Sequence, residues 1–202
     1  MTLPLYIFEA RYRKMVKTCV ETNQRRIVIA LSLPSEEAGD APATASVGTF
    51  VDILSVMENA DGTSNILAHG QGRCHVKLSR SESIENLDGS LSYLHYSEDL
   101  AYPLERDDPN LEQIAAWDAL EVFRTYAGHF FTDDAKKQLE ESLPDDLLFQ
   151  SSFVCANLRL EADARQALLE APSLSERFAA AQRLMLAQLE APPRVDEFFS
   201  EG

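Results

Sequence analysis

The chain has 202 residues, with 33 acidic against 18 basic side chains and a formal net charge of −15. Such an acidic chain repels phosphate backbones, which argues against nucleic acid as a partner. Hydrophobic residues make up 45% of the sequence, enough for a buried core, and the length fits one domain or two small ones.

Cysteine usage and hydropathy bear on the compartment. Cys19, Cys74 and Cys155 are an odd number of cysteines without close spacing, which argues for a reducing compartment and against a disulfide framework. No apolar run approaches the roughly 20 residues that a membrane helix needs. The N-terminus also lacks the charged and then apolar pattern of a secretion signal. We therefore expect a cytoplasmic protein that does not bind membranes.

The first predicted elements are a short extended segment and a helix. Residues 3–7 are expected to be extended, because the residue before Pro4 is disfavoured in helical conformation. In residues 8–20, apolar side chains recur every three or four positions, which predicts an amphipathic helix with a basic outer face that ends at Asn23. Glu9 and Arg13 have the spacing of a favourable ion pair on this helix. The apolar positions are Phe8, Tyr12, Met15, Val16 and Cys19.

A long hairpin is predicted over residues 47–78. A β-branched run over residues 26–33 first predicts a buried strand, and residues 34–46 read as a loop. Two further β-type runs then flank Asp61 and Gly62, a dipeptide that favours tight turns. Both faces of the first run are apolar, so we expect it to be covered on both sides. Gly70 and Gly72 predict a bend or bulge in the second run.

The chain then changes from strands to helices. Residues 79–90 read as turn-like and residues 91–96 as one more strand, which predicts an α+β protein with a β-rich domain over residues 1–106 and a helical domain over residues 107–202. The first predicted helix of this half runs from Pro109 to about Tyr126, with a break at Gly128. The next covers residues 133–141, and another begins at Pro144. Two more follow, over residues 161–169 and from Ser173 to before Pro192.

The last helix has the clearest pattern. Ser173 and Glu176 form a capping-box sequence, in which the two side chains satisfy free backbone N–H groups. An apolar stripe follows at Leu174, Phe178, Ala181, Met185 and Leu189. Phe198 and Phe199 in the C-terminal tail are candidates for docking on another surface.

Three local motifs together carry a resemblance. Residues 3–16 read LPLYIFEARYRKMV, Val47-Gly48-Thr49 leads to Ile53, and Asp61-Gly62 is followed by the segment 70–73, which reads GQGR. In these motifs and in their order the chain resembles the N-terminal substrate-binding domain of the ATP-dependent Lon proteases. The resemblance covers most of the chain, with Cys74 standing where the family usually has an aromatic residue. It implies a PUA-like twisted β-barrel or sheet followed by a helical bundle.

The resemblance also implies what to expect of the chemistry. The family normally has an earlier strand, which this chain begins too late to contain, so we expect unpaired backbone and an apolar groove at a sheet edge. The sequence has no phosphate-binding loop and is too short for the ATPase and Ser–Lys protease domains. We therefore expect a free-standing, non-enzymatic domain with no catalytic residues, no cofactor and no metal.

Seven residues are candidates for a polypeptide-binding cleft. They are Leu5, Ile7, Phe8, Tyr12, Gly70, Gly72 and Arg73. For three of them a structural role is the favoured interpretation: Phe8 and Tyr12 anchor the first helix, and Arg73 locks the hairpin to the helical half through carbonyls or carboxylates.

Alternative sites built on cysteine or histidine are disfavoured. Cys74 and His75 point to opposite faces of a strand, while His69 and His75 lie too far apart along it for one metal ion. Cys155 has apolar neighbours on a predicted helix and reads as a buried structural thiol.

Three function classes remain after these exclusions. The first is a module that binds unfolded or extended polypeptide, by strand addition at a sheet edge or in a cleft between the two halves. The second is an adaptor or regulator that docks on a folded partner such as a protease complex. A small-molecule binder or hydrolase ranks third, because no catalytic constellation is visible. The sequence does not define the oligomeric state.

Overall fold

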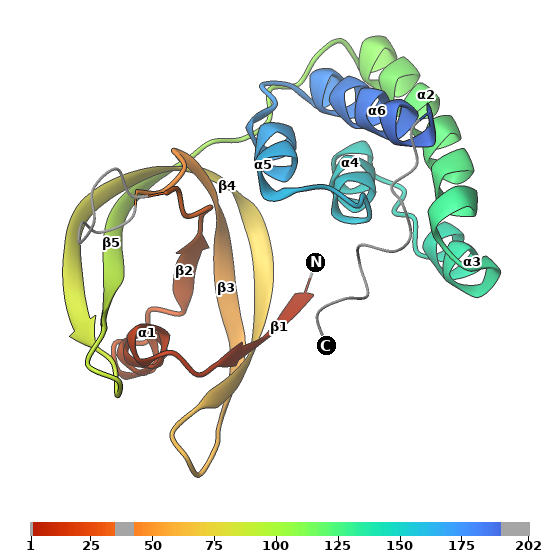
Figure 1. The fold of residues 1–202 in the computed structure, drawn as a ribbon. Helices are drawn as coiled ribbons and strands as arrows, with labels where there is room; N and C mark the ends of the chain where they lie inside the picture. The colour runs from red at the N-terminus through yellow and green to blue at the C-terminus, as the bar shows by residue number, and fades with distance from the viewer. Residues whose placement is uncertain (1, 35–42, 191–202) are drawn as a thin grey trace. The chain divides into compact units, whose positions relative to one another are not determined.

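The structure is a computed structural model that describes residues 2–34 and 43–190. The chain divides into two compact units, Met1–Pro103 and Leu104–Gly202. The described strands and the first helix belong to the first unit and the other described helices to the second (Figure 1), which confirms the α+β fold with strands before helices. The sequence predicts two domains with a boundary after residue 106. That each half folds independently stays a prediction.

The first unit is built on one antiparallel sheet. Within the described residues, β4 is paired with β1 along its first part and with β5 along its last part, and β3 lies between β4 and β2. The sheet is strongly curved, and α1 lies on its inner side (Figure 1). The elements of this unit are β1 (Thr2–Ile7), α1 (Ala10–Glu21), β2 (Arg26–Ile29), β3 (Val47–Glu58), β4 (Ser64–Glu85) and β5 (Leu91–Ala101).

The central hairpin has the predicted turn and the predicted bend. Gly62 has a φ of 77°, and the Asp61 carboxylate accepts hydrogen bonds from the N–H and the hydroxyl of Thr63, at 3.0 and 2.7 Å. Gly70 and Gly72 lie opposite neighbouring residues of β3, so Gln71 between them is the extra residue of a β-bulge. A bulge bends its strand and increases the local twist, which accounts for the corner in β4.

β4 corrects the expectation of a turn over residues 79–90. The strand continues to Glu85, and the turn is restricted to residues 86–90, where Gly89 has a φ of 80°. The polar sequence suggested a loop, but β5 supplies hydrogen-bond partners along this whole segment while its side chains remain largely solvent-exposed. Pairing with a distant strand therefore outweighed local composition.

Three further boundaries near the N-terminus differ from the sequence prediction. α1 begins at Ala10 instead of Phe8, although Asn23, with a φ of 55°, follows its end as expected. β2 ends at Ile29, which is 40% exposed, so the predicted strand over residues 26–33 is neither continuous nor fully buried. Pairing resumes at residues 31–33, which pair with residues 43–45. Coverage of β3 on both faces holds only for its first half, since Leu54 in the second half is 50% exposed.

The second unit contains five helices within the described residues. They are α2 (Pro109–Phe130), α3 (Asp133–Glu141), α4 (Leu147–Ala156), α5 (Ala162–Glu170) and α6 (Leu174–Glu190). α2 passes through Gly128 without the expected break, and α4 begins after Asp146, whose carboxylate caps it, instead of at Pro144. The predicted apolar stripe of α6 is confirmed, because Leu174 and Phe178 are at most 1% exposed. Phe198 and Phe199 lie outside the described residues.

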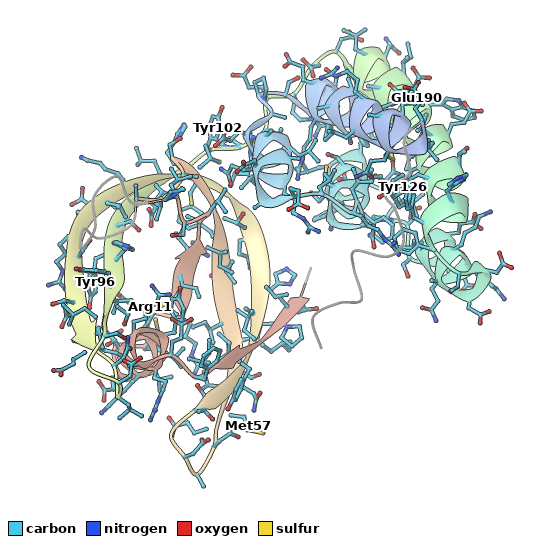
Figure 2. All side chains as sticks on the ribbon, in the orientation of Figure 1. Arg11, Met57, Tyr96, Tyr102, Tyr126 and Glu190 are labelled. Carbon is cyan, nitrogen blue, oxygen red and sulfur yellow. The ribbon has the colours of Figure 1, made fainter. Side chains whose placement is uncertain are left out.

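Each unit has its own hydrophobic core. In the first unit, Val16 of α1 packs on Ile53 and Ile66 of the sheet. In the second unit, Tyr126 is fully buried among the helices (Figure 2), and its hydroxyl oxygen accepts a hydrogen bond from the Arg159 N–H at 3.0 Å. The packing of α1 against the sheet is what places the site described next.

Candidate binding groove

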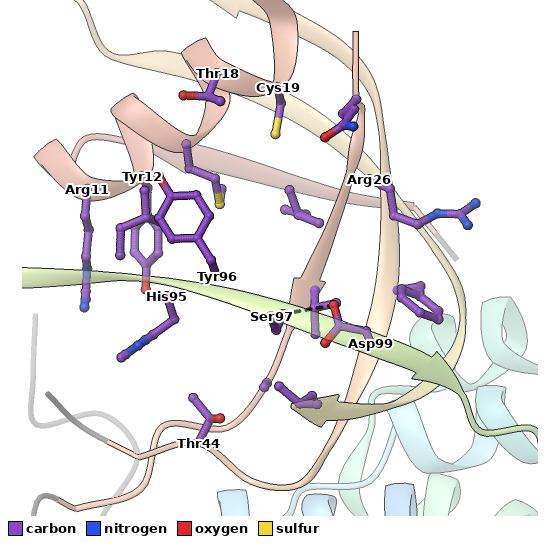
Figure 3. Close-up of a pocket in the computed structure, with 18 of the residues that line it drawn as sticks. Arg11, Tyr12, Thr18, Cys19, Arg26, Thr44, His95, Tyr96, Ser97 and Asp99 are labelled. Carbon is purple, nitrogen blue, oxygen red and sulfur yellow. Dashed lines mark hydrogen bonds between the residues drawn. The ribbon is translucent and has the colours of Figure 1, made fainter. Parts of the chain in front are cut away.

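A groove of about 740 Å³ lies in the first unit, bordered by α1, β2 and β5 (Figure 3). From α1, Arg11, Tyr12, Thr18 and Cys19 line it (Figure 3). The amphipathic pattern of the helix accounts for this position, because the face that carries Val16 is buried against the sheet and the adjoining face borders the groove. We refer to this space as the α1–β2–β5 groove.

The lining of the α1–β2–β5 groove is mixed, with apolar side chains beside polar and charged ones. Leu94 of β5 is 5% exposed, and Cys19 is half-buried, with a pKa that burial raises above its usual value. A protonated thiol in such surroundings behaves as a small apolar group. The apolar lining side chains are Met15, Cys19, Ile27, Val28, Phe50, Val76, Leu78 and Leu94.

The charged side chains of the groove are three arginines and two aspartates. Arg26 donates two hydrogen bonds to the carboxylate of Asp52, at 2.7 and 3.3 Å, and this contact lowers the pKa of Asp52. Asp99 accepts a hydrogen bond from the Ser97 hydroxyl at 2.9 Å (Figure 3). The charges of Arg26 and Asp52 therefore neutralise each other, whereas Asp99 keeps its negative charge.

Of the other two arginines, Arg11 has an acidic partner and Arg25 has none within the described residues. Arg11 is paired with Glu9 at 2.8 Å and lies over the ring of Tyr12, yet it still contributes, after burial, to lowering the pKa of His95. Arg25 is exposed, and its side chain has no hydrogen bond or ion pair to any residue that the structure describes. The lining thus has more cations than anions in a chain of net charge −15.

The edges of two strands border the groove. Side chains alternate between the two faces of a strand, so a cavity on one face contacts every second residue. Here the lining includes the consecutive residues 25–28 and 93–97, which places the groove along the edges of β2 and β5. Among the described strands, β2 pairs only with β3 and β5 only with β4, so each has one edge without a strand partner.

Four of the predicted cleft residues belong to the N-terminal segment, and they separate in the structure. Tyr12 lines the α1–β2–β5 groove. Leu5 and Ile7 instead point into the core that contains Val16. Phe8 is 61% exposed and stacks on Tyr6 at a centroid distance of 5.9 Å, so it does not anchor the helix as expected.

The other three predicted residues lie on β4. Gly70 and Gly72 form the bulge opposite β3. Arg73 is only 7% exposed, donates from Nε to the Tyr102 carbonyl at 3.1 Å, and places its guanidinium 4.4 Å from the centre of the Tyr102 ring. Arg73 and Tyr102 both belong to the first unit. Their contact therefore fixes the end of β5 and does not form the expected lock between the hairpin and the helical half. Binding by any of the seven predicted residues, Tyr12 included, stays a prediction.

Sequence reasoning missed most of the groove. A strand is predicted over residues 91–96, but nothing in the sequence of residues 91–99 assigns His95, Tyr96 or Asp99 to a site. The two walls come from residues separated by more than sixty positions, and no motif spacing connects them. The one available signal was the excess of arginine in residues 11–26 of an acidic chain.

The part of the chain that the structure describes has neither a metal-ligand cluster nor a membrane-spanning helix. Within residues 2–34 and 43–190, no group of three or more His, Cys, Asp or Glu side chains is arranged to hold a metal ion. None of the helices in the same ranges has the length and hydropathy required to span a bilayer.

Comparisons with known proteins agree with this architecture. The family model described as the ATP-dependent protease La (LON) substrate-binding domain matches residues 1–187. The N-terminal domain of Mycobacterium avium complex Lon protease is similar in fold, with a TM-score of 0.63 and 15% identity over 92% of this chain and 90% of that one. A Lon N-terminal domain protein from Xanthomonas campestris has a TM-score of 0.51 and 20% identity over 93% and 89% of the two chains. With a family match over nearly its whole length, this chain belongs to the family of Lon substrate-binding domains.

Proposed function

We propose that this chain binds unfolded or extended polypeptide in the α1–β2–β5 groove, without catalysing a reaction. Membership in a family of protease substrate-binding domains supports a polypeptide-binding module. The observation that carries the location is the groove itself, which offers apolar side chains and is bordered by strand edges. Extended backbone is the ligand that a free strand edge binds most directly.

The size and lining of the groove support this ligand. Its volume of about 740 Å³ lies within the range of known ligand sites. An unfolded chain exposes the apolar side chains that a folded protein buries, and transfer of such side chains onto Met15, Ile27 and Leu94 gains roughly 25 cal/mol per Å² of apolar surface. A compact folded protein offers few such side chains.

The non-enzymatic part of the proposal is supported by the family match to a substrate-binding domain, and the one thiol that lines the groove agrees with it. Burial raises the pKa of Cys19, which keeps the thiol protonated at neutral pH. The thiolate is the nucleophilic form of cysteine, so Cys19 is poorly suited to attack a peptide bond.

The test is a titration of the purified chain against a fluorescein-labelled, reduced and carboxymethylated lactalbumin. We expect saturable binding with a Kd in the range of tens of micromolar or lower. In a Cys155→Ser background, attachment of a bulky maleimide to Cys19 is expected to weaken binding about tenfold. The same reagent applied to the Cys19→Ser, Cys155→Ser variant is the control and should leave the affinity of that variant unchanged. Absence of saturable binding at tens of micromolar protein would contradict the proposal.

A second candidate function is docking on a folded partner, as an adaptor or regulator. It is favoured by an exposed apolar stripe on α2, where Leu111, Ile114 and Trp117 are spaced three residues apart and are 58%, 59% and 68% exposed. Tryptophan is enriched among residues that dominate protein interfaces.

The adaptor function has a separate test. A stoichiometric partner recovered from native extract with the wild-type chain should be lost with Trp117→Ala and retained with Arg124→Ala, a substitution at an exposed position of the same helix. Recovery of the same proteins with both variants would remove the stripe as a docking surface.

A further inference from the structure

We propose that the polypeptide enters the α1–β2–β5 groove as a β-strand that pairs with β2 on one side and with β5 on the other. This proposal rests on the proposed function and specifies its ligand: an extended segment in which apolar side chains alternate with acidic ones. The inserted strand would close the gap in the curved sheet of the first unit.

The pairing argument begins with the two strand edges. β2 and β5 each use one edge in the described sheet, for β3 and β4 respectively, and their other edges face the groove. Alternate residues of an antiparallel strand direct their N–H and C=O groups to opposite edges, so half of these groups face the groove. A ligand strand between the two edges would satisfy both rows at once, whereas a side-chain ligand would satisfy neither.

The direction of the inserted strand follows from the ladder. β2 is antiparallel to β3, β3 to β4, and β4 to β5, so β2 and β5 run in opposite senses along the curved sheet. A strand between them must therefore be parallel to one neighbour and antiparallel to the other. Mixed pairing of this kind occurs in natural sheets.

The alternation of side chains follows from the walls of the groove. One face of an inserted strand would contact the apolar floor that includes Met15 and Leu94, and the other face would be directed outward. Arg11, which is paired with Glu9, and Arg25, which has no partner among the described side chains, both line the groove. Asp99 is the one lining carboxylate without a cationic partner among the described residues, so the positive charge available to a ligand is that of Arg25. Acidic side chains complement this arginine although the whole chain carries −15.

The negative charge of the whole chain makes a preference for acidic peptides informative about contacts within the groove. Long-range attraction by a chain of net charge −15 favours a cationic peptide. A preference for an acidic peptide over its lysine counterpart can arise only from local contacts such as those at Arg25.

The experiment uses the full chain and a capped eight-residue peptide of alternating valine and glutamate. Two derivatives carry N-methyl groups on the valine nitrogens or on the glutamate nitrogens, so each derivative lacks the N–H donors of one strand edge. Insertion between two strands predicts that both derivatives bind at least tenfold more weakly than the parent peptide. Weakening by only one derivative, or by neither, would overturn insertion between β2 and β5.

Two further measurements locate the peptide. The parent peptide is expected to slow alkylation of Cys19, which lines the groove, and unchanged alkylation in the presence of saturating peptide would overturn the proposal. Arg25→Glu is expected to weaken binding of the valine–glutamate peptide about fivefold. The same substitution is expected to strengthen binding of a peptide in which lysine replaces each glutamate. Arg124→Glu, at an exposed position in the second unit, is the matched control and should leave both affinities unchanged.

The outcomes separate this inference from the proposed function. If labelled lactalbumin binds and is displaced by blocking Cys19, but the N-methylated peptides bind as well as the parent, the module binds polypeptide through side chains and strand insertion is wrong. If labelled lactalbumin shows no saturable binding, the proposed function fails as well.

Discussion

At the scale of single residues, the most unusual group is the buried carboxylate of Glu112. Its side chain is 2% exposed and lies in the first turn of α2. It accepts hydrogen bonds from Nε and Nη2 of Arg106, at 2.7 and 2.5 Å, and from the Asp107 N–H at 2.9 Å. A negative charge at a helix N-terminus is favoured, and a buried carboxylate is tolerated only when it is paired in this way.

Glu112→Gln is therefore expected to destabilise the second unit. The variant keeps the shape of the side chain but loses the charge-assisted hydrogen bonds, at a cost of about 2 kcal/mol in the free energy of unfolding at pH 7. Glu121→Gln, at an exposed position of the same helix, is the control and should change it by less than about 0.5 kcal/mol. Urea denaturation of both variants measures the difference.

The same substitution carries a pH prediction. The Arg106 hydrogen bonds, followed by that from Asp107, hold the pKa of Glu112 below its usual value. Since the unfolded state then binds more protons than the folded state, the stabilisation is complete above about pH 4.3 and is lost as the pH falls through the folded pKa. The gap between wild type and Glu112→Gln should narrow towards pH 3. An unchanged gap would show that the carboxylate charge is not the cause.

At the scale of elements, close approach of strands explains one of the sequence motifs. A Cβ added at Gly48 of β3 would lie 2.9 Å from the Ile29 carbonyl oxygen, 2.9 Å from Val28 Cγ1 and 3.0 Å from Val76 Cγ2. At Gly72 of β4, an added Cβ would meet nothing within 4 Å. Two glycines of one hairpin thus have different physical roles.

The matched pair Gly48→Ala and Gly72→Ala tests this difference. Gly48→Ala is expected to lower the stability of the first unit by about 1–3 kcal/mol, because backbone and side chains must shift to admit the methyl group. Gly72→Ala should change stability by no more than about 0.5 kcal/mol. The measurement is the urea midpoint of Cys74 alkylation, since Cys74 is 0% exposed in the folded unit. Equal midpoints for the two variants would contradict the packing argument.

The helices show which boundaries can be predicted from local sequence patterns. The bounds of α3 follow from its sequence, because Thr132 supplies the cap and Ser142 follows the last helical residue. Gly128 did not end α2, because the neighbouring Ala127 is buried and tertiary packing outweighs the helix propensity of one glycine. Local signals therefore predicted most elements, and most errors concern where an element begins or ends, as in β4, whose end is decided by pairing with β5.

At the scale of the whole molecule, each unit has a core of its own, and we predict that the two unfold independently. Phe178→Ala removes a side chain that is 1% exposed in the second unit, at an expected cost of about 3–5 kcal/mol. Leu186→Ala, at a position of the same helix that is 42% exposed, is the control.

Alkylation in rising urea, followed by peptide mapping, reports both units in one sample. Cys74 reports the first unit and the half-buried Cys155 the second. Phe178→Ala should move only the Cys155 transition to lower urea. A parallel shift of the Cys74 transition would mean that the two units unfold as one, against the two-domain interpretation.

The sequence by itself determined the order of elements, the tight turn at Asp61 and Gly62, the apolar stripe of α6, and the family. These features depend on neighbours within a few positions or on motifs that lie close together in the chain. Only the tertiary structure decided the length of β4, the buried pairing of Glu112, and the α1–β2–β5 groove. The groove required the curvature of the sheet to bring residues 25–28 and 93–97 to opposite sides of one space, and such long-range geometry is not encoded in any local spacing.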